Sequence, residues 1–175
     1  HSFPTRRSSD LHAVLNCPDI AGHPRVTCLI AGTNDLAKDM QIRVTSERHV
    51  RRDGMLYALS KMVTAARAYN IGVLDGVFND IADLDGLGQE CEHGTALGFD
   101  GKTLIHPNQI ETANRLFAPT FEEVNEAENI IAAFEDPENA GKGVLKVNGK
   151  MTELLHLEQA KRVVAIASAI QEMET

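Results

Sequence analysis

The first residues that could do chemistry are Gly32-Thr33-Asn34-Asp35, which follow the apolar and β-branched run Val26–Ala31. A carboxylate after such a run and a glycine turn is expected at the carboxyl end of a strand. In α/β barrels the catalytic groups come from those strand ends. We therefore predict that Asp35 lies where a catalytic group belongs. The alternative is an ordinary turn or helix N-cap.

Two further strand ends carry polar groups. Asp75 follows the run Ile71–Leu74 and could hold a water molecule or a metal-bound group, or form a structural salt bridge. His106 follows Lys102–Ile105 and precedes Pro107, which favours an extended backbone at the histidine. Its side chain could contact a substrate, or pack beneath the strand ends.

Three strand–helix repeats must position these groups. We expect strands at 26–31, 71–74 and 102–105, and helices at 54–69, at 84–97 and from 107 onward. Gly86, Gly88 and Gly94 weaken the middle helix, and Asn108 is the predicted N-cap of the third. Alternation of this kind favours an α/β fold with a parallel sheet. Three strands alone cannot close a barrel, which needs eight.

Other segments are expected to lie outside these repeats. A short helix is predicted at 11–21, and residues 38–53 are polar and basic, which suits an exposed loop with Arg52 in it. Thr120 and Glu123 form a capping-box pattern at the start of a helix. The pair Asn148-Gly149 is a turn signal before a last helix.

These boundaries divide the chain into three parts. Residues 1–10 have neither strand nor helix periodicity, and we expect them to be a non-native leader. Residues 11–118 hold the strand–helix repeats. Residues 119–175 form a small C-terminal helical cap.

Composition mainly excludes classes of partner. The chain of 175 residues has 25 acidic and 17 basic side chains, a formal net charge of -8 and a pI near 5.3. This balance argues against nucleic acid and against an anionic membrane surface. No apolar run approaches the ~20 residues of a membrane helix, and the three cysteines form no disulfide framework. The histidines have no zinc-ligand spacing. We expect a cytoplasmic protein.

Six short segments, in this order, carry a resemblance to a known family. They are Gly22-His-Pro-Arg-Val26, Gly32-Thr-Asn-Asp-Leu36, Asp75-Gly-Val77, Gly98-Phe-Asp-Gly-Lys102, Ile105-His-Pro-Asn-Gln109 and Gly149-Lys-Met151. With them the chain resembles the HpcH/HpaI aldolase and citrate lyase β-chain family, which includes malyl-CoA lyase. The resemblance runs from about residue 11 to the end.

That resemblance implies a TIM barrel, of which this chain would supply the last three βα units of the (β/α)8 fold plus the cap. It implies a Mg²⁺-dependent carbon–carbon lyase that cleaves or forms a β-hydroxyacyl-CoA such as malyl-CoA or citramalyl-CoA, with acetyl-CoA and a 2-oxoacid as the other side of the reaction. The alternatives are a citrate lyase β-chain acting on an acyl-carrier-protein thioester, and a non-catalytic remnant that caps oligomers. A homo-oligomer, trimer or hexamer, is also implied.

The resemblance assigns roles to single residues as well. Asp35 corresponds to a Mg²⁺ ligand, whereas the glutamate that accompanies it in the family would fall near Ser9, inside the leader. We therefore expect the chain alone to be inactive. Glu153 stands where the family has a catalytic aspartate that serves a neighbouring subunit, although it could also be only a favourable charge at a helix N-terminus.

Substrate contacts are the last expectation that follows from the resemblance. Asn34 and the turn Ile105-His106-Pro107 would face the substrate, and their backbone N–H groups would stabilise the thioester enolate. Asp75 and the His106 side chain complete the predicted substrate-binding residues.

Overall fold

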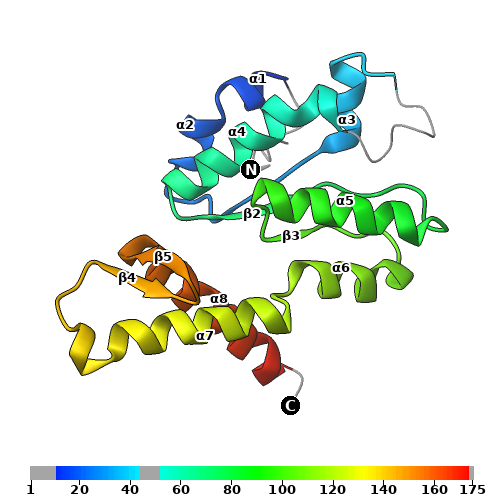
Figure 1. Cartoon of the computed structure of the whole chain (residues 1–175). Coiled ribbons are helices and arrows are strands. Elements are labelled where there is room, and N and C mark those ends of the chain that lie inside the picture. Colours follow the sequence, from blue (N-terminus) through cyan, green and yellow to red (C-terminus); the bar gives the residue numbers. More distant parts are fainter. Residues whose placement is uncertain (1–10, 44–51, 174–175) are drawn as a thin grey trace. The chain divides into compact units, whose positions relative to one another are not determined.

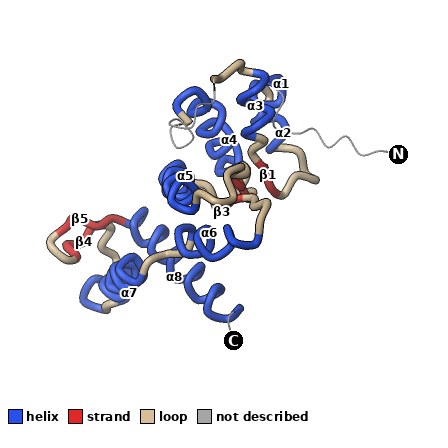
Figure 2. The backbone as a smooth tube through the Cα atoms, turned by 90° about the vertical axis from the view of Figure 1, so that its right-hand side faces the viewer, coloured by secondary structure: helices blue, strands red, loops and turns tan. Residues whose placement is uncertain are grey.

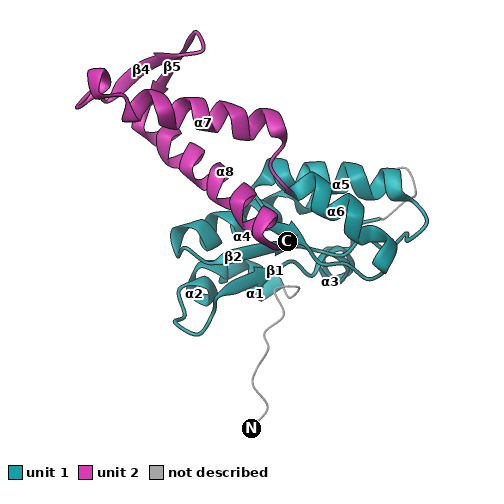
Figure 3. Cartoon of the chain, turned by 90° about the horizontal axis from the view of Figure 1, so that it is seen from below, with its two compact units in different colours: residues 1–117 teal, residues 118–175 magenta. Residues whose placement is uncertain are grey.

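The computed structural model describes residues 11–43 and 52–173 and divides the chain into two compact units, residues 1–117 and 118–175 (Figure 3). The predicted leader, residues 1–10, lies outside the described residues. Each unit has its own elements and is described by itself.

The first unit is an α/β layer (Figure 1). Its elements are α1 Leu11–Leu15, α2 Cys17–Ala21, β1 Cys28–Ile30, α3 Thr33–Asp39, η2 Asp53–Met55, α4 Leu56–Ala68, β2 Gly72–Asp75, α5 Leu84–Leu97, β3 Gly101–Lys102, η3 Pro107–Gln109 and α6 Ile110–Phe117. The α/β fold class and the order of strands and helices are confirmed. The predicted helix at 11–21 is two short helices, with Pro18 near the start of the second.

The three strands form one parallel sheet in the order β1-β2-β3. Leu29 pairs with Val73, and Asp75 pairs with Lys102, so the side chains of each pair point to the same face. Leu29, Val73 and Asp75 are buried on the face that the helices cover, whereas Ile30 on the opposite face is half exposed. The third strand ends at Lys102, short of the predicted 105. The Thr103 N–H still donates to the Asp75 carbonyl of β2, whereas the Ile105 N–H donates to the Gln109 side chain.

The main core fills the space between sheet and helices. It is built around fully buried side chains from α3, α4 and β2, among them Leu36, Leu59, Met62 and Val73. Helix α4 supplies residues at helical spacing, as its apolar pattern predicts. This packing holds the helices against the sheet, so the strand ends and their loops have a rigid support.

The second unit is a helix pair with a β-hairpin (Figure 2). Its elements are α7 Phe121–Glu135, η4 Pro137–Asn139, β4 Val144–Val147, β5 Lys150–Glu153 and α8 Leu154–Met173. The capping box is confirmed, because Thr120 Oγ1 accepts from the Glu123 N–H and Glu123 accepts from the Thr120 N–H. Asn148 and Gly149, with φ of 49° and 81°, form the two-residue turn between β4 and β5.

Candidate active site

The predicted site residues of the first unit lie at or after the carboxyl ends of the three parallel strands: Asp75 ends β2, Asn34 and Asp35 are in the first turn of α3, and Ile105 and His106 follow β3. Because the carboxyl ends of parallel strands meet at one edge of a sheet, these positions are neighbours. Asp35 is in the first turn of α3, two residues after the buried Thr33, and is exposed. The structure thus presents this carboxylate at the strand-end edge of the sheet.

Asn34 links the start of α3 to the loop after β2. Its Nδ2 donates to Asn79 Oδ1 at 3.0 Å, and Asn79 Nδ2 donates to Asn34 Oδ1 at 2.7 Å. This reciprocal amide pair joins the first turn of α3 to the β2–α5 loop beside Asp35. Both polar atoms of the Asn34 side chain are therefore engaged by protein, and sequence reasoning missed Asn79.

The loop after β3 is held by a buried glutamine. Gln109 is fully buried; its Oε1 accepts from the Ile105 N–H at 3.1 Å, and its Nε2 donates to the Phe78 carbonyl at 3.0 Å. The Ile105 N–H, predicted as an enolate donor, is therefore already bonded, and Pro107 has no N–H. In the turn formed by residues 105–107, the His106 N–H is therefore the remaining candidate donor to the enolate.

His106 is exposed and acts as the N-cap of η3. Its Nδ1 accepts from the Asn108 N–H at 3.3 Å and lies 2.7 Å from Asn108 Oδ1. The prediction of Asn108 as the N-cap is wrong. The Asn108 side chain instead donates from Nδ2 to the Ile81 carbonyl. This hydrogen bond connects the turn at His106 to the loop between β2 and α5.

Asp75 lies in a buried cluster of four charged groups. Arg52 Nη1 donates to both Asp75 carboxylate oxygens, at 2.6 and 2.7 Å, and Lys102 Nζ is 3.4 Å from Oδ2. Lys102 also donates to Glu90. Two cations and two carboxylates balance, which a buried set of charges requires. The salt-bridge alternative left open for Asp75 describes this geometry, and its role in substrate binding stays a prediction.

The expectation of an exposed Arg52 is wrong. Its side chain is 2% exposed, because its guanidinium crosses from the start of η2 to the end of β2. Its Nη2 lies 3.0 Å from His93 Nδ1, and burial together with the Arg52 charge lowers the pKa of His93. The imidazole is thereby kept neutral and can accept from the guanidinium.

Helix α5 approaches this cluster closely at Gly94. A Cβ at that position would lie 3.0 Å from Asp75 Oδ2 and 3.3 Å from the Phe117 ring. Glycine weakens an isolated helix, but the close approach to Asp75 and Phe117 explains why Gly94 is present here. The helix forms over Leu84–Leu97, as predicted.

Glu153 belongs to the second unit. It is the last residue of β5, half-buried, and directly precedes α8. Its backbone N–H donates to His156 Nδ1 at 2.9 Å. Both the catalytic role and the helix-charge alternative stay open for its carboxylate.

Other candidate chemistry is limited in the described part of the chain. Burial raises the pKa of the Cys91 thiol to about 11, which keeps it protonated and unreactive. Among residues 11–43 and 52–173, no three His, Cys, Asp or Glu side chains are grouped so that they could hold a metal ion. No described helix is long and apolar enough to cross a membrane.

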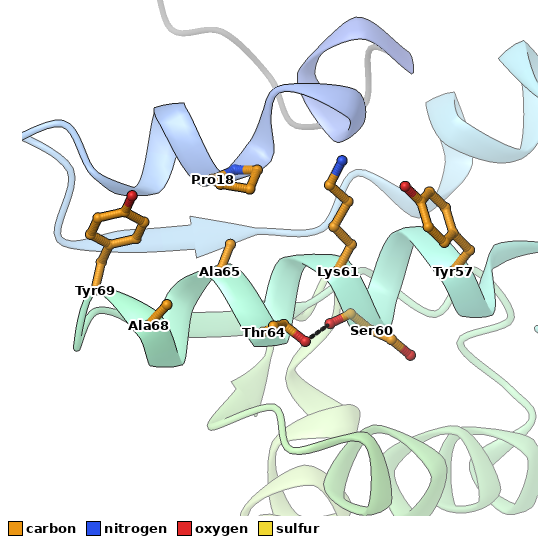
Figure 4. Close-up of a pocket in the computed structure, with 8 residues that line it drawn as sticks. All are labelled: Pro18, Tyr57, Ser60, Lys61, Thr64, Ala65, Ala68 and Tyr69. Atoms are coloured by element: carbon orange, nitrogen blue, oxygen red, sulfur yellow. Dashed lines mark hydrogen bonds between the residues drawn. The ribbon is translucent and has the colours of Figure 1, made fainter.

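A cavity of about 760 Å³ lies between α2 and α4, away from the strand-end residues (Figure 4). It is lined by two tyrosines, one lysine and small side chains: Pro18, Tyr57, Ser60, Lys61, Thr64, Ala65, Ala68 and Tyr69. Lys61 donates to the Leu15 carbonyl at 2.7 Å and lies 5.7 Å from the Tyr57 ring centroid. None of the predicted site residues lines this cavity.

Comparison with known proteins decides the family. The model of the HpcH/HpaI aldolase/citrate lyase family matches residues 10–107, which span Asp35, Asp75 and His106. The chain belongs to this family.

Relatives and solved structures extend the similarity into the second unit. A (3S)-malyl-CoA thioesterase of Cereibacter sphaeroides is 47% identical over 157 residues, 90% of this chain and 54% of the relative. A citrate lyase subunit beta of Leuconostoc mesenteroides subsp. cremoris is 37% identical over 157 residues, 89% of this chain and 51% of the relative. The chain spans about half the length of these family members.

A solved structure agrees in fold. The protein CitE of Mycobacterium tuberculosis, in complex with magnesium, acetoacetate and coenzyme A, superposes with a TM-score of 0.76 at 25% identity. The match covers 89% of this chain and 57% of that protein. The similarity therefore includes elements of both units.

Sequence reasoning missed the residues that hold the site together. Arg52, Glu90, Lys102 and Gln109 were not predicted as residues that hold the site. For Glu90 and Lys102, the signal was a charged residue next to apolar positions of a predicted helix or strand, which is rarely buried unless it is paired. For His156, the available signal was its position three residues after the last residue of β5.

Proposed function

We propose that this chain is part of a Mg²⁺-dependent carbon–carbon lyase that acts on a β-hydroxyacyl-CoA such as malyl-CoA or citramalyl-CoA. Cleavage would yield acetyl-CoA and a 2-oxoacid. The observation that carries the proposal is the exposed Asp35 carboxylate in the first turn of α3, which follows β1, inside the segment that matches the family. Names of relatives that act on CoA esters support the substrate class.

Asp35 fits a magnesium ion as one of few protein ligands. Mg²⁺ is usually bound through one or two carboxylates and keeps water molecules that substrate oxygens replace. An exposed carboxylate at a strand end, with a rigid loop behind it, suits that pattern. When bound, the ion would orient the substrate carboxylate and hydroxyl and lower the pKa of that hydroxyl.

The other candidate residues would bind the substrate and transfer a proton to or from its enolate carbon. Backbone N–H groups near Asn34 and at His106 are candidates to donate to the thioester oxygen, where charge develops in the transition state. Glu153 would carry a proton on a carboxyl oxygen and deliver it to the enolate carbon, or remove it in the direction of condensation. Glutamate reaches about 1 Å further than aspartate, and misplacement of that size can cost roughly 10²-fold in rate.

Thioester hydrolysis is the second candidate, and the 47% identity to a (3S)-malyl-CoA thioesterase favours it. Here water would add to the thioester carbonyl and the CoA thiolate would leave, so that malyl-CoA gives malate and CoA. The same residues could hold the substrate in both reactions. A citrate lyase β-chain acting on an acyl-carrier thioester, and a non-catalytic oligomer cap, remain alternatives.

Two further proposals concern the fold and the assembly of the whole protein. We infer that the three-stranded parallel sheet is the last part of a TIM barrel and that residues 119–175 are a C-terminal extension with the role of a cap. The parallel order, the half-exposed Ile30 face and the likeness to CitE support the barrel. We further propose a cytoplasmic homo-oligomer, a trimer or hexamer.

The test is a product assay on the protein expressed from its native gene. We expect malyl-CoA or citramalyl-CoA to give acetyl-CoA plus a 2-oxoacid with Mg²⁺, and no reaction with EDTA. Free CoA plus the hydroxyacid would instead establish the thioesterase. Asp35→Asn is expected to lower either activity at least ~10²-fold, as loss of a metal-site partner does. Full activity of Asp35→Asn would refute the metal assignment, and Asp39→Asn in the same helix is the matched control.

A further inference from the structure

The junction between β5 and α8 places Glu153 under two backbone constraints. On one side Glu153 ends the antiparallel ladder, where it pairs with Val144. On the other side its N–H donates to Nδ1 of His156, 2.9 Å away and three residues along the chain. The backbone that carries the candidate acid is therefore held from both directions.

The His156 contact has the geometry of half a capping box. In that motif the third residue of a helix reaches back to the N–H of the N-cap residue. The same unit contains the usual form at α7, where Glu123 accepts from the Thr120 N–H at 2.7 Å. At α8 an imidazole takes the place of the carboxylate.

The Glu153 carboxylate itself is not used to build the fold. Within residues 52–173 and 11–43 it makes no hydrogen bond or ion pair, and the residue is half-buried. Its neighbour Thr152, in contrast, is buried in the unit. A carboxylate with a fixed backbone and no structural partner is available for proton transfer.

We propose that His156 is a positioning residue for Glu153: its Nδ1 holds the Glu153 backbone at the start of α8 and so directs the carboxylate. Because Nδ1 accepts, the neutral imidazole carries its proton on Nε2. The inference rests on the proposed role of Glu153 as the acid or base. It names His156 as the residue that keeps the Glu153 carboxylate in position for proton transfer.

Two variants at residue 156 separate positioning from bulk packing. His156→Leu removes the acceptor and keeps an apolar body, whereas His156→Gln keeps an acceptor that suits the third position of a helix. In the protein expressed from its native gene, kcat with malyl-CoA is expected to fall about 10-fold or more in His156→Leu, as expected for a misplaced group. In His156→Gln it should stay within about 3-fold of wild type, with KM unchanged in both.

Hydrogen exchange of the Glu153 amide provides a readout besides activity. We expect faster exchange in His156→Leu and protection in His156→Gln. Thr120→Val is the matched control, because it removes the cap of α7 without touching this junction, and it should lower Tm while leaving kcat unchanged.

Three outcomes would overturn the inference: an unchanged kcat in His156→Leu, an equal loss in His156→Gln, or an equal loss in Thr120→Val. Glu153→Gln distinguishes this failure from that of the proposed function. A large loss of kcat there, with an active His156→Leu, would remove only the positioning role. An active Glu153→Gln would remove the acid role on which it rests.

Discussion

Arg52→Met is the most informative perturbation of the fold. Arg52 Nη1 contacts both oxygens of Asp75, and the two side chains are 2% and 0% exposed. Methionine preserves most of the stem but leaves the Asp75 carboxylate, among the residues that the structure describes, with only Lys102, at 3.4 Å, to neutralise it. Glu90 competes for the same ammonium.

Breaking one partner of a buried pair costs about 3–5 kcal/mol. Total unfolding free energies are only about 5–15 kcal/mol, so this loss would be a large fraction of the total. Arg67→Met is the matched control in the same unit, because the Arg67–Asp100 pair is 35% and 29% exposed. Solvent screening should limit its cost to about 1 kcal/mol.

Urea denaturation followed by circular dichroism measures both variants. We expect the free energy of unfolding to fall several times more in Arg52→Met than in Arg67→Met. The double variant Arg52→Met/Asp75→Leu should recover part of the lost stability. It removes the Asp75 charge as well, so the remaining buried charges, Glu90 and Lys102, pair with each other. A cost of Arg52→Met no larger than that of Arg67→Met would refute the reasoning.

Two other perturbations test single contacts. The lowered pKa of His93 means that the unfolded chain takes up the proton first, so the free energy of unfolding should fall as pH drops below about 6.5. His93→Asn should show a smaller difference between pH 7.5 and 5.5 in urea midpoints, and an identical difference would contradict this. Gln109→Leu removes the hydrogen bonds that Gln109 makes with the Phe78 carbonyl and the Ile105 N–H, each worth about 0.5–1.5 kcal/mol. Thermal unfolding checks it, and an unchanged Tm would count against the role of Gln109.

Local signals in the sequence predicted local structure well. The capping box at Thr120, the turn at Asn148-Gly149 and the helix over Leu84–Leu97 all form as expected. Each depends on hydrogen bonds or apolar spacing within a few residues, so short segments contain the information. The end of the third strand was less predictable, since Ile105 has a strand-like side chain but its N–H donates to the Gln109 side chain of η3.

The sequence by itself determined the order of strands and helices and the place of Asp35 after a strand, because both follow from short-range pattern and turn chemistry. Only the tertiary structure decided the partners of Asp75. Arg52 is 23 residues before it and Lys102 is 27 after it, and the sheet register and the close approach of α5 at Gly94 bring them together. The partners of a buried charge are residues that the fold brings close from distant parts of the chain, so no short segment of the sequence identifies them.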